Sequence, residues 1–149
     1  MYQDTITLFN RKKSNTAGDT WYPTVIKSVN LNIDRAAILA KYGASSQDNA
    51  ALHIQYQQKN DEITIVCDSK TKKPWLPPKE WDETEDSLTF NPNGDFFWQG
   101  EWTGGIVSDA DYGPDGFYSY MNRTHDYVFA VSSVGGPYSV IPHFEIMGK

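Results

Sequence analysis

The chain contains three histidines and one cysteine, and these are the residues whose spacing could indicate a metal site. His53, His125 and His143 are widely separated, and Cys67 lies in the apolar run that begins at Ile63. Metal sites are usually signalled by ligands only a few residues apart. The histidines are therefore expected to be strand-surface or interface residues, and no metal or other cofactor is predicted. A thiol in an apolar run is expected to be buried as a small hydrophobe.

Acidic residues gather in two segments that could also do chemistry. The segment 109–116 has part of a calcium-loop pattern, but glycine and proline occupy positions where the pattern needs a ligand and the turn glycine. Carboxylate pairs for acid–base catalysis occur as Glu80 with Glu83 and Asp82 with Asp86. In a charged segment flanked by prolines, such pairs most simply solvate the surface. Nucleotide-binding loops and the nucleophile elbow are missing from the sequence, so the chain is predicted not to be an enzyme.

Composition and charge narrow the classes of partner. The 149 residues include nine Tyr, seven Phe and five Trp, a composition that favours β-structure with broad aromatic contacts in a single domain. Thirteen Lys and Arg against nineteen Asp and Glu give a net charge of −6. An acidic chain is a poor general binder of nucleic acid, because such binding needs cations that displace counterions from phosphates. The N-terminus lacks a signal-peptide pattern and no apolar run is long enough to span a membrane, so folding in a reducing cytoplasm is expected.

Alternating segments predict the strands. Thr5 to Phe9 and Trp21 to Ile26 form a first hairpin, in which Pro23 favours an edge position. Val29 to Asp34 alternates most sharply, with Leu31 and Ile33 expected in the core. A long insertion follows, with a possible short helix over 35–43. Further strands are expected at 52–56, 62–67 and 95–102.

The C-terminal stretch 127–149 is the expected scaffold of the fold. Residues 127–134 and 138–146 read as two strands joined by a turn at 135–137, where two glycines precede a proline. Pro142 cannot donate a ladder hydrogen bond, which places the second strand at an edge or a bulge. Such an interrupted end strand is a natural surface for a neighbouring subunit, although the pattern alone favours a hairpin that only finishes a monomeric barrel, since edges are usually protected rather than paired.

Two insertions complete the predicted architecture. Residues 70–92 are expected to make a surface excursion held to the body by Trp75 and Trp81, and residues 104–123 to be loop-rich with one short helix around Phe117. Together the strands predict a single mainly β domain over 1–149, a small β-barrel with long loops and one or two short helices.

Four segments of the chain resemble, in order, small virion proteins of tailed phages that infect Gram-positive bacteria. These segments are 4–11 (DTITLFNR), 20–26 (TWYPTVI), 95–101 (DFFWQGE) and 142–149 (PHFEIMGK). The closest resemblance is to head-completion, or stopper, proteins of the head–tail connector, also described as minor capsid proteins. It covers both ends of the chain well and the middle thinly.

The resemblance implies an SH3-like barrel that assembles as a ring, expected to be a hexamer, at the head–tail junction of the virion. Its partners would be the portal and adaptor proteins on the head side, and the tail terminator or tail tube on the tail side. Double-stranded DNA would pass through without specific binding, and no membrane is involved. The loop 34–50 would be the channel or stopper loop, with Asp34, Arg35, Ile38, Lys41, Tyr42, Ser45 and Gln47 as its candidate residues. Tyr138, Pro142, His143 and Phe144 would lie at subunit contacts.

Two alternatives stay open at this point. One is a carbohydrate-binding or receptor-binding virion module that uses Trp75, Trp81, Trp98 and Trp102 as stacking platforms, although tryptophans more often simply cover a barrel. The other is a neighbouring connector component, either the adaptor, which should be rich in helix, or the tail terminator.

Overall fold

The structure is a computed structural model that describes residues 2–14, 18–33, 49–84 and 86–149. Its elements, in chain order, are β1 (Asp4–Lys12), β2 (Thr20–Ile33), β3 (Ala50–Gln55), β4 (Gln57–Lys59), β5 (Glu62–Val66), β6 (Lys72–Pro74), β7 (Phe96–Trp98), β8 (Val107–Ser108), the 3-10 helix η1 (Asp109–Tyr112), α2 (Gly116–Thr124), β9 (Val128–Tyr138) and β10 (His143–Gly148). The molecule is mainly β, as predicted.

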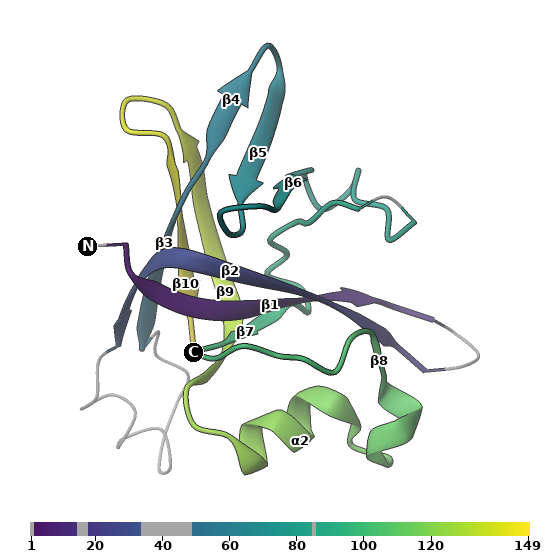
Figure 1. Ribbon diagram of the computed structural model, residues 1–149. Helices are drawn as coiled ribbons and strands as arrows, with labels where there is room; N and C mark the ends of the chain where they lie inside the picture. Colours follow the sequence, from purple (N-terminus) through teal and green to yellow (C-terminus); the bar gives the residue numbers. More distant parts are fainter. Residues whose placement is uncertain (1, 15–17, 34–48, 85) are drawn as a thin grey trace.

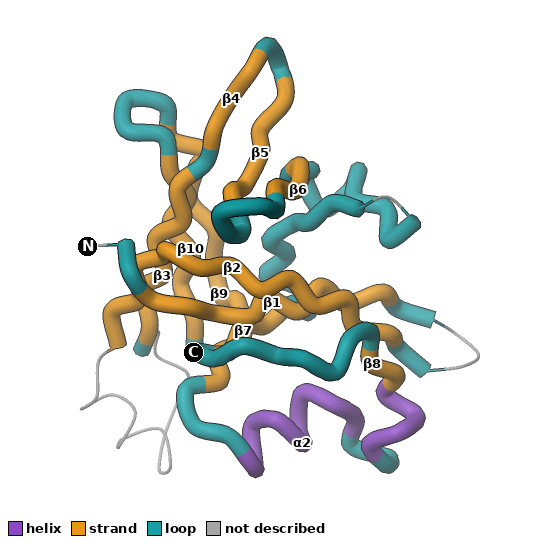
Figure 2. The backbone as a smooth tube through the Cα atoms, viewed as in Figure 1, coloured by secondary structure: helices purple, strands orange, loops and turns teal. Residues whose placement is uncertain are grey.

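Six antiparallel strands close into a barrel (Figures 1 and 2). The strand order is β1-β7-β9-β10-β3-β2, and pairing of β2 with β1 completes the circle. The short strand β8 extends β2, and β4, β5 and β6 form a separate three-stranded sheet. In Figure 1 the β4–β5 hairpin and the β9–β10 hairpin project from the same end of the barrel. The predicted small β-barrel is therefore confirmed.

Strand β1 contributes side chains to two apolar clusters, because both of its faces are covered. Ile6 and Leu8 point into the barrel, where they join the larger cluster. Phe9 belongs to the second cluster, which packs beneath α2 against Trp21 and Phe117. The predicted short helix is thus confirmed, with Phe117 and Met121 buried on its inner face. Because the barrel interior covers one face of β1 and α2 covers the other, residues on both faces are inaccessible to solvent.

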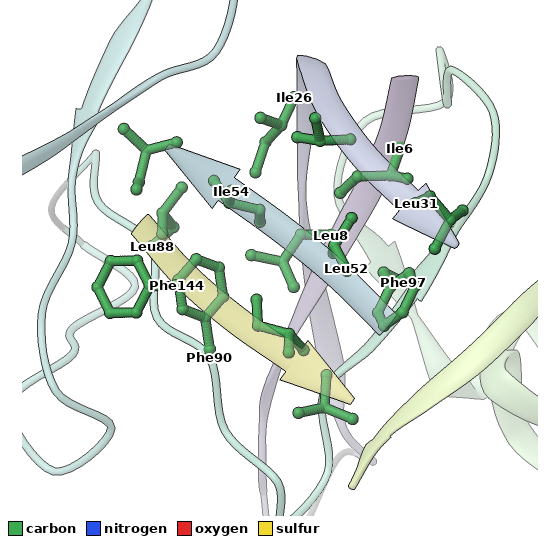
Figure 3. Close-up of a cluster of buried hydrophobic side chains, with 14 of the residues drawn as sticks. Ile6, Leu8, Ile26, Leu31, Leu52, Ile54, Leu88, Phe90, Phe97 and Phe144 are labelled. Atoms are coloured by element: carbon green, nitrogen blue, oxygen red, sulfur yellow. The ribbon is translucent and has the colours of Figure 1, made fainter. Parts of the chain in front are cut away.

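The segment 70–92 is more than the predicted surface excursion. Trp75 does pack against the core, but Leu88 and Phe90 are fully buried in the same cluster, where Phe90 contacts the ring of Phe144 (Figure 3). Residues 72–74 also pair with β5 as strand β6. Leu88 and Phe90 alternate with Ser87 and Thr89, but a run of four residues beside prolines and charges is too short to predict a buried segment.

The predicted turn of the C-terminal hairpin is wrong. Strand β9 continues through Gly135, Gly136 and Pro137 to Tyr138, and the turn is formed by residues 139–142. The pairing register shifts between His143 and Glu145, so the glycines form a β-bulge instead of a turn. Gly136 has a φ of +107°, a conformation that side chains with a Cβ rarely adopt.

Of the two placements predicted around Pro142, an edge or a bulge, the edge is wrong, whereas the register shift between His143 and Glu145 confirms a bulge next to it. Strand β10 is hydrogen-bonded to β9 on one side and to β3 on the other. Pro142 lies in the turn before the strand, so its missing N–H interrupts no ladder. Barrel closure produces this arrangement, since it brings the last strand beside a strand formed nearly a hundred residues earlier. The expected strand 95–102 is shorter than predicted and ends at Trp98.

Gly148 occupies a position where the barrel wall leaves no room for a side chain. A Cβ there would lie 2.7 Å from the Phe129 Cβ and 2.9 Å from the Phe97 ring. We expect Gly148→Ala to destabilise the fold by about 1–3 kcal/mol, because the close contacts are with core atoms that cannot move aside. Urea unfolding followed by tryptophan fluorescence measures this, with exposed Ser133→Ala on β9 as the control. A midpoint shared by both variants would contradict the packing argument.

Candidate functional site

The structure places the two groups of predicted site residues very differently. The channel-loop candidates Asp34, Arg35, Ile38, Lys41, Tyr42, Ser45 and Gln47 lie outside the described residues. The interface candidates lie around the projecting end of the β9–β10 hairpin. Tyr138 and Pro142 are exposed there, and His143 is half-buried at the start of β10.

Phe144 does not belong to an exposed interface. Its side chain is fully buried, with ring contacts to Tyr56, Trp75 and Phe90. The alternation of β10 directs Phe144 and Ile146 into the barrel, which leaves His143 and Glu145 on the outer face. The assignment of Phe144 to a subunit contact is therefore corrected to the core.

The sequence reasoning missed the most exposed apolar residues of the hairpin. Val140 is 97% exposed and Ile141 66% exposed, because both lie in the turn and not in a strand. Tyr138, at the end of β9, is 43% exposed. We call Tyr138, Val140 and Ile141 the apolar tip. The available signal was Pro142, which favours a turn at least as strongly as an irregular strand.

A groove of about 840 Å³ opens beside the apolar tip. It lies where β2 and β3 separate beyond their last paired residues, Asn30 and His53. Ile26, Val29 and Ile54 supply an apolar floor, each only 1% exposed. Ile141 and Pro142 form one wall of the groove. The rim carries the polar and charged residues Lys27, Gln55, Gln57, Asp68, Ser69 and Lys70.

Two histidines that are ninety residues apart converge on one carboxylate. Glu145 Oε1 lies 3.2 Å from His143 Nε2 and 3.5 Å from His53 Nε2. His143 Nδ1 also lies 2.6 Å from the Ile141 carbonyl oxygen. Both ring nitrogens of His143 therefore face acceptors, and only the doubly protonated ring can donate to both. The bond to Ile141, with the help of Glu145, raises the pKa of His143 above its usual value.

Removal of the Glu145 charge should lower the pKa of His143. We expect the imidazole of the native protein to titrate above 6.5, and Glu145→Gln to bring it back towards that value, because one of the groups that favour the charged ring is lost. NMR titration of the histidine ring protons measures both values. The Ile141 carbonyl remains in the variant, so part of the shift should persist. A native pKa below 6.5 would contradict the geometry.

The four candidate tryptophans do not form one stacking platform. Each is engaged with a different neighbour within the molecule: Trp75 with Phe144, Trp81 with Tyr22, Trp98 with His125, and Trp102 with Phe9 and Phe117. The rings of Trp98 and Trp102 also lie over Gly100 and Gly104, where an added Cβ would come within 2.8 Å of the ring. These contacts support the interpretation that the tryptophans cover the barrel.

The acidic pairs of the sequence are engaged separately. Glu83 pairs with Lys12 at 3.2 Å, and Asp86 pairs with Lys73 at 3.4 Å. Asp82 accepts hydrogen bonds from the Thr84 backbone and hydroxyl at 2.9 Å, which closes a local turn. Each of these three carboxylates therefore has a cation or a local turn as its partner.

Asp109, in the segment with the partial calcium pattern, connects α2 to the barrel. Its Oδ1 accepts hydrogen bonds from the Trp21 indole at 2.6 Å and from the Phe117 backbone at 2.9 Å. The carboxylate thereby satisfies a free N–H in the first turn of α2. Across the described ranges, no three His, Cys, Asp or Glu side chains are placed to hold a metal ion.

Asp95 is the carboxylate most strongly affected by its surroundings. It is 3% exposed and accepts hydrogen bonds from Asn10 Nδ2 at 2.7 Å and from the backbone N–H groups of Arg11 and Asn91 at 2.9 Å each. Burial nevertheless raises the pKa of Asp95 to about 6, and the hydrogen bonds offset only part of the effect. Because Asp95 ties β1 to the turn before β7, its role is in holding the barrel together.

Cys67 is buried as predicted, at 2% exposure, and burial raises the pKa of its thiol to about 11. The thiol is consequently a poor nucleophile. Within the part of the chain that the structure describes, no helix combines the length and apolar character needed to cross a bilayer.

Comparison with known proteins gives one result at the level of family. No curated protein and no solved structure matches this chain. One family profile matches residues 1–149, and it is described as a family of unknown function, DUF6751. The chain therefore belongs to the DUF6751 family.

Proposed function

We propose that this chain is a structural virion protein of the phage head–tail connector, where it forms the head-completion or stopper ring. In this role it closes the DNA channel after packaging and joins the head to the tail. The observation that carries the proposal is the apolar tip, which projects from a closed barrel beside an open groove. A hydrophobic projection of this kind is typical of a surface that meets another protein.

The charge of the chain supports the same function. DNA must pass quickly through a connector, so its wall should not hold phosphates. A net charge of −6 on each copy repels the DNA backbone, and a ring of copies multiplies the effect. Retention of the DNA would then be steric.

Among the neighbouring connector components, the mainly β fold disfavours the adaptor. An adaptor should be rich in helix, whereas this chain has one α-helix of nine residues among its described elements. The internal contacts of the tryptophans likewise give the carbohydrate-binding alternative no support. The stopper ring is the connector role that fits a compact barrel best.

Electron microscopy of purified virions tests the proposal. An affinity tag on the exposed C-terminal Lys149, labelled with gold, should mark the joint between head and tail. An untagged virion preparation is the control for nonspecific gold. Labelling of tail fibres or of the capsid interior would overturn the proposal.

A further inference from the structure

The apolar tip cannot be satisfied within its own chain. Val140 is 97% exposed, and it is not among the residues that line the adjacent groove. Ile141 contributes to the groove wall and is still 66% exposed. Two large aliphatic side chains on a turn remain hydrated, so the chain does not gain the favourable free energy that burial of their apolar surface would give. Their position indicates a contact with another molecule.

The adjacent groove offers the complementary shape and chemistry. Its apolar floor of Ile26, Val29 and Ile54 matches aliphatic side chains, and a volume of about 840 Å³ is more than enough for a turn of a few residues. Backbone groups of β2 and β3 near the groove are not paired with each other beyond Asn30 and His53. The floor can thus bury apolar groups while the walls offer hydrogen bonds.

Charge favours a second copy of this chain as the occupant. Lys27 and Lys70, together with Asp68, give the rim of the groove a net charge of +1, whereas the chain as a whole carries −6. Lys27 has one partly exposed partner, Glu101 at 3.6 Å, and Lys70 forms no ion pair with any described residue. The β4–β5 hairpin projects from the same end of the barrel as the apolar tip (Figure 1) and carries the exposed Asp61 and Glu62 with one exposed cation, Lys59. An approaching copy therefore presents acidic and apolar groups together to a cationic rim and an apolar floor.

We propose that the apolar tip of one copy inserts into the groove between β2 and β3 of the next copy. The contact joins the tip of one copy to the groove of the other, so a pair of copies keeps one free groove and one free tip. Head-to-tail contacts of this kind close into rings when the rotation between copies allows it. The inference rests on the proposed function, since it names the contact through which a connector ring would be built.

A charge on the tip should prevent assembly without harming the fold. We expect Val140→Asp to weaken self-association at least about tenfold, because an aspartate would be buried on the apolar floor. The matched control is Ile106→Asp, which places the same charge at another aliphatic residue, 65% exposed and distant in sequence from the tip and groove. Sedimentation velocity over a dilution series measures association, and thermal unfolding checks that both variants fold. Equal association of the two variants would overturn the inference.

Disulfide trapping distinguishes this contact from a symmetric one. Cys67 is buried and unreactive, so single cysteines can be added to the native chain. Val140→Cys places a thiol on the tip, and Ser69→Cys places one on the exposed groove rim. Under mild oxidation a mixture of the two variants should form a mixed dimer, and neither variant alone should cross-link. Tip-to-tip cross-linking of Val140→Cys alone would overturn the inference.

The outcomes separate the contact from the proposed function. Oligomers that form independently of residue 140, or that resist trapping between residues 140 and 69, overturn the contact and leave the connector role standing. Mixed disulfides together with gold labelling away from the head–tail joint support the contact and overturn the connector role.

Discussion

Replacement of Phe144 by alanine is expected to cost about 3–5 kcal/mol of folding free energy, the largest effect among the substitutions considered. Phe144 has no exposed surface and makes ring contacts with Tyr56, Trp75 and Phe90. Truncation to Cβ removes a whole ring from the point where the C-terminal strand meets the segment 70–92. The surrounding rings come from separate elements and cannot all move inward to fill the space.

Chemical denaturation of the monomer measures this cost directly. The matched control is Val140→Ala on the same hairpin, which removes apolar atoms from a side chain that is 97% exposed and should change stability little. A residue at a subunit contact would behave in the opposite way, since its loss would weaken association and leave monomer stability intact. That result for Phe144 would restore its assignment to an interface.

Phe144 also illustrates how far the sequence predicts this fold. Alternation predicted a strand over residues 138–146, because period 2 reports which residues share a face, and the structure has β10 at His143–Gly148. It could not identify the neighbours of the strand. An amphipathic strand has the same pattern at an edge and in the middle of a barrel, and only closure decides between the two. The resemblance placed Phe144 at a subunit contact, and the alternation of the strand alone did not decide between that surface and the core.

The predicted position of the hairpin turn was wrong for a related physical reason. Two glycines and a proline are compatible with a turn and equally with a β-bulge, since both need unusual backbone angles and an unpaired N–H. The structure uses Gly135 and Gly136 for the bulge, so the turn shifts to residues 139–142. That shift exposes Val140 and Ile141 on the tip. Because the turn was predicted at residues 135–137, the apolar tip was not identified from the sequence.

The convergence of His53 and His143 on Glu145 could not be predicted from spacing. His53 lies on β3 and the other two residues lie on β10, and the register places His53 opposite Glu145. Residues that meet across a strand pair have no fixed separation in the sequence. In contrast, Cys67 and the buried side of α2 were predicted correctly, because burial in an apolar run and helical spacing are local properties.

The fold should become more stable as the pH falls from 8 to 5, and Asp95 supplies the main reason. Burial raises its pKa in the folded protein to about 6, whereas the unfolded chain should keep a value near 3.8. A raised pKa means that the folded state binds the proton more tightly. The resulting stabilisation is complete below pH 3.8 and is lost as the pH rises through about 6. Between pH 8 and pH 5 the gain should be about 1.4 kcal/mol.

Two other groups of residues must be separated from this effect. The raised pKa of His143 acts in the same direction, so the measurement is best made in a His143→Gln background. Asp19, Asp68 and Asp82 have lowered pKa values, and their contribution is lost only as the pH falls below about 3.8, outside the chosen range. Urea unfolding at pH 8, 6.5 and 5 then reports mainly on Asp95.

Asp95→Asn is the variant that decides the question. It keeps the shape of the side chain and removes its titration, so its stability should be nearly independent of pH over the same range. The variant should also be less stable than the native protein at pH 8, where the ionised carboxylate accepts all three hydrogen bonds, because the asparagine NH₂ group faces at least one of the N–H donors of Asn10, Arg11 and Asn91. If the variant and the native protein gained equal stability between pH 8 and pH 5, a different titrating group would be responsible. The buried carboxylate would then be ionised throughout and held by its three hydrogen bonds alone.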